Sequence, residues 1–102
     1  MRSREQHQLV RFDIREAYIW YERKERGLGR RFNQELRAVL HRLPKDALLY
    51  ASRFDDIRRV NLPSFPHGVF YFADESHVVV LGVLHGARDS ETELQQQRQT
   101  YG

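Results

Sequence analysis

Residues 57–88 constrain the fold more than any other stretch of the chain. They contain three short runs of β-branched and aromatic residues, at 57–62, 65–72 and 78–85, divided by Pro, Gly, Asp and Ser. Such runs are typical of strands, and residues 74–77 are short enough for a hairpin loop. We therefore expect a three-stranded antiparallel meander. Residues 78–84 are apolar on both faces, which predicts a central strand that is covered on both sides.

Two helices are expected before the meander. Asp13 and Glu16 have the spacing of a capping box, and apolar residues follow at helical intervals until Gly27-Leu28-Gly29. A second apolar stripe runs from Phe32 to Leu43, and Pro44 is expected to end that helix. Two helices joined by a tight glycine turn make an αα-hairpin whose stripes face the sheet.

The remaining segments carry weaker patterns. Residues 1–6 are polar and are expected to be frayed, whereas residues 8–12 alternate and predict a short edge strand. Residues 44–56 are expected to form a loop held to the core edge by Leu48, Leu49, Tyr50 and Phe54. A capping box at residues 90–93 begins a short, mostly polar C-terminal helix. The order is β-α-α-β-β-β plus that helix, an α+β two-layer fold with an antiparallel-rich sheet and the αα-hairpin on one face.

Composition limits the class of protein. A chain of 102 residues fits a single domain spanning residues 1–102, and without cysteine it has neither disulfides nor thiolate metal sites. Apolar runs are too short to span a membrane, so we expect a soluble cytoplasmic protein with no membrane partner. His41, His67 and His77 are too scattered to suggest a metal site, and no cofactor is expected.

The charge is uneven and rests on arginine. Residues 1–42 carry 11 Lys and Arg against 6 Asp and Glu, whereas the remainder carries 6 against 8. Of the 17 basic residues, all but Lys24 and Lys45 are arginine. Arginine holds phosphate and carboxylate groups with two hydrogen bonds, so this bias favours an anionic partner, either nucleic acid or an acidic protein segment. A general arginine preference of the genome accounts for the composition equally well.

Three motifs, in order and at this spacing, resemble one known family. They are Trp20-Tyr21-Glu22 with Gly27-Leu28-Gly29 and Phe32, then Phe65-Pro66-His67-Gly68-Val69-Phe70-Tyr71, and then His85 with Arg88-Asp89. Over residues 9–98 the chain is similar to the RelE/ParE toxins of type II toxin–antitoxin, or plasmid-stabilisation, systems. The resemblance implies a toxin that is silenced in a hetero-oligomeric complex by a cognate antitoxin, whose C-terminal segment wraps the helical hairpin and sheet.

The resemblance leaves two modes of poisoning open. RelE-like members cut messenger RNA on the ribosome without a metal, and ParE-like members bind DNA gyrase. A metal-free nuclease needs a base, an acid and cations for the phosphorane. Here His85 and Arg88 are the candidate catalytic residues, but the acidic residues after Arg88 and the missing tyrosine in that segment count against cleavage. A structural role for His85 is the simpler reading.

The hypothesis that these residues favour is a ParE-like toxin that inhibits growth by binding DNA gyrase rather than by catalysis. The alternatives are a metal-independent mRNA endoribonuclease and a solitary family member without toxicity. The residues expected to bind the target or the antitoxin are Arg58, Arg59, Arg88, Trp20, Tyr21 and Phe32. Arg58 and Arg59 point to opposite faces of a strand, so at most one of them faces a given site.

Overall fold

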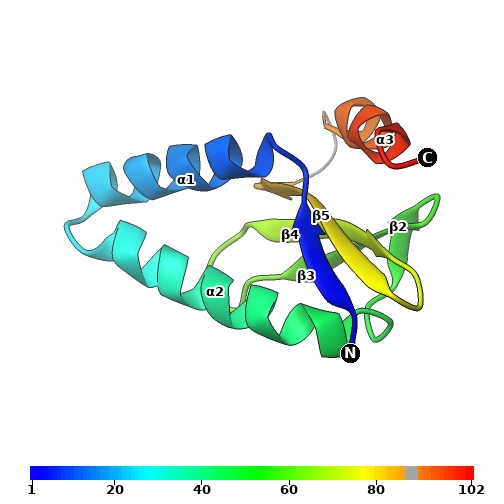
Figure 1. Cartoon of the computed structure of the whole chain (residues 1–102). Coiled ribbons are helices and arrows are strands. Elements are labelled where there is room, and N and C mark those ends of the chain that lie inside the picture. The colour runs from blue at the N-terminus through cyan, green and yellow to red at the C-terminus, as the bar shows by residue number, and fades with distance from the viewer. Residues whose placement is uncertain (87–89) are drawn as a thin grey trace.

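The computed structural model describes residues 1–86 and 90–102. Eight elements follow one another along the chain (Figure 1). The helices are α1 (Val10–Lys24), α2 (Leu28–Asp46) and α3 (Glu91–Gln99), and the strands are β1 (Ser3–Gln6), β2 (Ser52–Phe54), β3 (Ile57–Asn61), β4 (Gly68–Ala73) and β5 (His77–Leu84). This arrangement confirms the predicted α+β class, the antiparallel-rich sheet and the helical hairpin.

The strands form one sheet of five, in the order β1-β5-β4-β3-β2. The antiparallel pairs β3–β4 and β4–β5 are the predicted meander. Strand β5 is buried over most of its length, because alternate residues face two separate apolar clusters. The prediction that this strand is covered on both faces is therefore confirmed.

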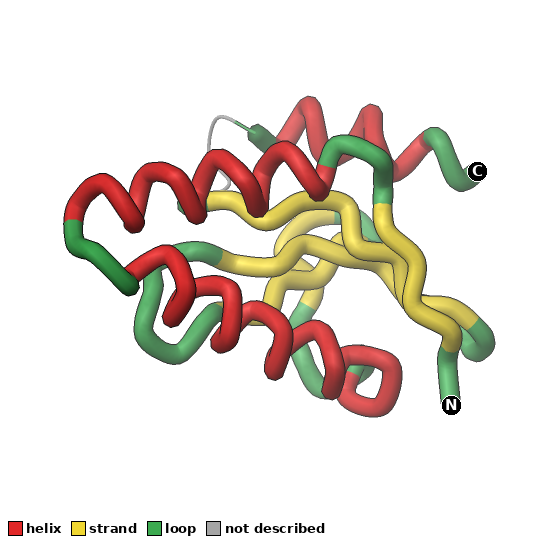
Figure 2. Tube along the Cα trace, turned by 60° about the vertical axis from the view of Figure 1, so that its left-hand side comes forward, coloured by secondary structure: helices red, strands yellow, loops and turns green. Residues whose placement is uncertain are grey.

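The helical hairpin covers one face of the sheet. Figures 1 and 2 show α1 and α2 meeting at a tight turn and diverging from it, with the sheet packed between their open ends. Gly27 occupies the left-handed region at φ 89°, a conformation that costs glycine little, and it caps the start of α2. Phe32, Leu36 and Leu43 of α2 are buried against Val69 and Tyr71 of the sheet, so hydrophobic burial holds the two layers together.

Helix α3 covers the other face. Its Leu94 is fully buried in a cluster with Phe70, Phe72 and Leu81. The Gln97 side-chain amide donates to the Leu81 carbonyl at 2.7 Å. A helix of mostly polar residues is marginal alone, and this anchoring explains why it forms.

The prediction of the N-terminal strand was wrong, because the strand lies earlier in the chain than residues 8–12. Residues 8–12 are not a strand, because Val10 already begins α1 and is buried in the core. The edge strand is Ser3–Gln6, which pairs in parallel with β5 in the segment expected to be frayed. The four side chains of β1 are all exposed, so its sequence has no hydrophobic pattern. The strand is held in the sheet by its backbone pairing with β5.

Three local predictions also differ from the structure. Pro44 lies inside α2, which continues to Asp46. The loop after it contains β2, and Leu48 and Leu49 are exposed at 56% and 77% rather than held to the core, whereas Tyr50 and Phe54 do pack against it. Neither Asp13 nor Ser90 makes a side-chain capping hydrogen bond, and the residue before α1 is Leu9.

Candidate functional site

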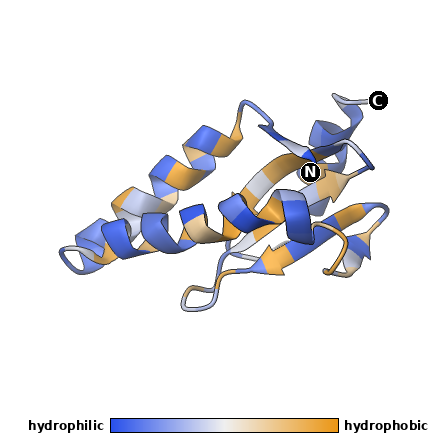
Figure 3. Ribbon diagram, turned by 60° about the horizontal axis from the view of Figure 1, so that its bottom comes forward, coloured by the Kyte–Doolittle hydropathy of each residue, from blue (hydrophilic) through white to orange (hydrophobic). Residues whose placement is uncertain are grey.

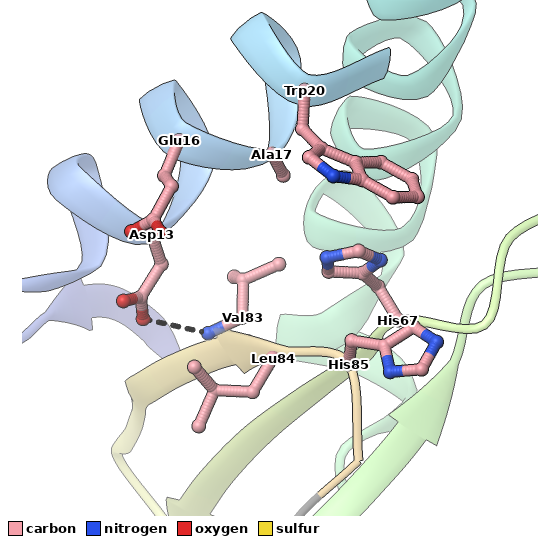
Figure 4. Close-up of a pocket in the computed structure, with 8 residues that line it drawn as sticks. All are labelled: Asp13, Glu16, Ala17, Trp20, His67, Val83, Leu84 and His85. Carbon is pink, nitrogen blue, oxygen red and sulfur yellow. Dashed lines mark hydrogen bonds between the residues drawn. The ribbon is translucent and has the colours of Figure 1, made fainter. Parts of the chain in front are cut away.

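A pocket of about 330 Å³ lies between α1 and the end of β5. Figure 4 shows two carboxylates at one end, a tryptophan and two histidines at the other, and apolar side chains between them. Helix α1 supplies Asp13, Glu16, Ala17 and Trp20, the strand and the residue after it supply Val83, Leu84 and His85, and the turn before β4 supplies His67.

Asp13 is the most perturbed carboxylate of the described residues. Its Oδ2 accepts a hydrogen bond of 3.0 Å from the Val83 amide, which ties α1 to β5 (Figure 4). Burial raises the pKa of Asp13 from 3.8 to about 6, although the Val83 hydrogen bond acts in the opposite direction. Desolvation disfavours the charged form of a carboxylate. The ionised Asp13 at neutral pH therefore lowers the stability of the folded protein.

The two histidines have different surroundings. His67 is buried, shares a hydrogen bond of 3.1 Å with the Tyr21 hydroxyl, and has its pKa lowered to about 4, chiefly by burial and then by His85 and Arg59. It is therefore neutral at physiological pH. His85 is exposed at the end of β5, with its ring centre 5.6 Å from that of His67. Of the two histidines, only His85 is accessible to solvent or to a partner.

Helix α1 and the residue before it carry four exposed apolar side chains. Trp20 is 51% exposed and forms the pocket rim, and Phe12 is 50% exposed on the same helix. Leu9 and Ile19 are also exposed at 44% and 36%. Arg15, Glu16 and Arg23 are exposed among them on the same helix, so the apolar group that marks a docking place is Trp20 at the pocket rim.

The structure separates the residues that the sequence suggested for binding. Trp20 lines the pocket, whereas Tyr21 and Phe32 are buried in the core, where both rings contact His67 of the pocket. Arg59 lies over the Phe70 ring on the face that α3 covers, and Arg58 donates to the Tyr50 carbonyl, so the two arginines do face opposite sides. Arg88 lies outside the described residues.

Nothing in the sequence alone marks Asp13 and Glu16 as site residues. Their spacing in the sequence predicts a helix capping box. In the structure both carboxylates line the pocket. Among residues 1–86 and 90–102, no three His, Asp or Glu side chains come together in a way that could hold a metal ion. Within the same residues, no helix is long and apolar enough to span a bilayer.

Comparison with known proteins gives the family and the fold. A family model described as the ParE toxin of the type II toxin–antitoxin system parDE matches residues 5–90. No curated protein matches the chain. Among solved structures, the chain is similar to one from a chromosomal ParDE toxin–antitoxin system of P. aeruginosa, with a TM-score of 0.72 and 15% identity over 81% of this chain and 94% of that one.

Proposed function

We propose that this chain, which belongs to the ParE toxin family of type II toxin–antitoxin systems, is neutralised by an antitoxin segment that docks on α1 and in the pocket beside it. The observation that carries this proposal is the half-exposed Trp20 at the rim of a pocket whose floor is formed by Ala17, Val83 and Leu84. An amphipathic segment of the antitoxin would cover this surface with its apolar side chains.

The chemistry of the pocket also indicates what the docking segment carries. Asp13 and Glu16 line one end, and no lysine or arginine is among the described residues that line the pocket. A basic side chain beside the apolar anchors would meet these carboxylates. The Trp20 ring already has the Lys24 ammonium 4.0 Å from its centre, so the carboxylates are the attraction that the pocket offers a cation. We expect at least one lysine or arginine in the part of the antitoxin that reaches this pocket.

We further propose that the toxin acts by binding DNA gyrase rather than by cutting RNA. Cleavage through the 2′-hydroxyl requires cations around the phosphorane. In the described part of the pocket, His67 is neutral and hydrogen-bonded, and two carboxylates occupy the end that faces the histidines. Their charge would repel a phosphate, which favours a binding toxin.

Cleavage through His85 and Arg88 stays as the alternative, because His85 is exposed at the end of β5. Induced expression of the chain, followed by mapping of mRNA 5′ ends and of gyrase-linked DNA breaks, separates the two. We expect growth arrest with DNA breaks and intact mRNA. If the wild type instead produced new mRNA ends, and these were absent with His85→Ala and with Arg88→Ala, the chain would be a nuclease and not a gyrase poison. Normal growth at high expression would indicate a family member without toxicity.

A further inference from the structure

Asp13 lies where α1, β5 and α3 meet. Its Oδ2 accepts the hydrogen bond of 3.0 Å from the Val83 amide. Gly82 leaves the room for this contact, because a Cβ at that position would lie 3.0 Å from the Leu94 side chain of α3 and 3.5 Å from Asp13 Oδ2. The carboxylate is therefore held against the backbone of β5 and beside an apolar side chain, where water reaches only part of it.

The charged groups that face Asp13 are of its own sign. Glu16 of α1 lines the same pocket, and Glu93 approaches from α3. The other titratable groups of the pocket are His67 from the turn before β4, whose pKa is lowered to about 4, and the exposed His85 after β5. Among the described residues, Asp13 forms no ion pair. Its charge is thus uncompensated within this part of the chain.

A carboxylate in such surroundings binds a proton more readily than one in water. Burial is the main reason that the pKa of Asp13 rises from 3.8 to about 6; the Val83 hydrogen bond opposes the rise, and Glu16 and Glu93 add to it. The charge of the pocket therefore changes between about pH 5 and pH 7, where an exposed carboxylate is already ionised.

A docked cation and this proton would use the same carboxylate. Charged and apolar residues alternate along α1 (Figure 3), so a segment that docks beside this helix meets both kinds of group. Val83 occupies only Oδ2 of Asp13, and Figure 4 shows the carboxylate beside that of Glu16 at one end of the pocket. A lysine or arginine that contacts Asp13 Oδ1 stabilises the ionised form and so opposes binding of the proton.

We infer that a basic side chain of the antitoxin and a proton compete for Asp13, so that docking in the pocket between α1 and β5 weakens under mildly acidic conditions. The inference rests on the proposed antitoxin docking and adds the residue that selects the partner's cation. About nine-tenths of Asp13 is ionised at pH 7 and about a tenth at pH 5, so the affinity should fall about tenfold between these pH values.

The test measures Kd from pH 5 to pH 7.5, at constant ionic strength, between the full chain and the antitoxin that restores growth when the two are expressed together. Asp13→Asn keeps an oxygen for the Val83 amide, and it should bind more weakly at pH 7 and change less than about threefold over the range. The matched control is Glu75→Gln, which removes the same charge from the exposed turn between β4 and β5, outside the pocket. It should keep the wild-type pH profile.

Two further measurements assign the profile to Asp13. A protonated His85 would also repel a cation in this pocket, so His85→Gln should retain the tenfold fall if Asp13 is the group responsible. Calorimetry of the wild type at pH 6, in two buffers with different ionisation enthalpies, should show about half a proton more released on binding than with Asp13→Asn.

Failure of the inference can be distinguished from failure of the docking proposal. The inference alone is overturned if a wild-type complex that needs Trp20 has a flat pH profile, or if the fall persists in Asp13→Asn or disappears in His85→Gln. It is also overturned if the Asp13 carboxyl carbon of the free chain titrates near the ordinary value of 3.8 by NMR. No binding at pH 7.5, or binding that Trp20→Ser leaves unchanged, would overturn the docking proposal and the inference with it.

Discussion

Replacing Asp13 by asparagine should make the protein more stable at neutral pH. Asp13→Asn keeps a side-chain oxygen for the Val83 amide but removes the charge that burial disfavours. The pKa of Asp13 is about 6 in the folded protein and 3.8 is its ordinary value, so the native state binds the proton more tightly than the unfolded chain. Wild-type stability from this group therefore falls as the pH rises from about 4 to about 6.

The size of the effect follows from the shift. Each pKa unit corresponds to about 1.4 kcal/mol, so a shift of roughly two units would give about 3 kcal/mol. Solvent in the open pocket screens the charge, and about 1 to 2 kcal/mol is the expected gain. His67 titrates in the opposite sense over the same range, because its pKa is lowered to about 4 and its contribution to stability is lost as the pH falls from 6.5.

Urea unfolding of both proteins from pH 4 to pH 7.5 measures the difference. Subtracting wild type from Asp13→Asn at each pH cancels the contribution of His67 and of the other titrating groups that both share. The difference should be near its minimum at pH 4 and should grow by about 1 to 2 kcal/mol above pH 6. The assignment of Asp13 as a buried, destabilising carboxylate would be refuted if the unfolding free energies of both proteins changed in parallel with pH. It would also be refuted if Asp13→Asn became less stable relative to the wild type as the pH rises.

Two further substitutions test how the helices are packed. Gly29→Ala should destabilise the fold by about 1 to 3 kcal/mol in urea unfolding, because the added Cβ would lie 2.7 Å from the Tyr18 backbone carbonyl oxygen. A more stable variant would show that helix propensity outweighs this contact and that the hairpin is loosely packed at Gly29. Leu94→Ala should cost about 2 to 5 kcal/mol and increase hydrogen exchange across α3 before the meander, whereas uniform protection of α3 would mean that Leu94 does not anchor it.

Much of the fold could be predicted because its elements carry apolar patterns. The α2 stripe and the β3–β5 meander bury alternate or helically spaced side chains, and the structure has both. Strand β1 has four exposed side chains and is fixed by its parallel pairing with β5, a long-range interaction that leaves no local pattern. The first helix was therefore predicted to start too late, with Asp13 as its cap.

The candidate site was harder to predict than the fold. Trp20 stood out in the sequence and lines the pocket, but Asp13 and Glu16 join it only because α1 packs against the end of β5. Arg58 and Arg59 are adjacent in the sequence, yet they belong to opposite faces of the sheet. Their separation follows from strand geometry, whereas the pocket depends on contacts between residues about 70 positions apart.

The most direct test of docking at this pocket is the melting temperature of the protein with a saturating amount of its antitoxin. At a free concentration of 100 Kd, binding should stabilise the wild-type fold by about 2.7 kcal/mol. Trp20→Ser should lose much of that shift, while Leu49→Ser, which changes an even more exposed apolar residue outside the pocket, should keep it. No shift for the wild type, or the same shift for Trp20→Ser as for Leu49→Ser, would contradict docking at the pocket between α1 and β5.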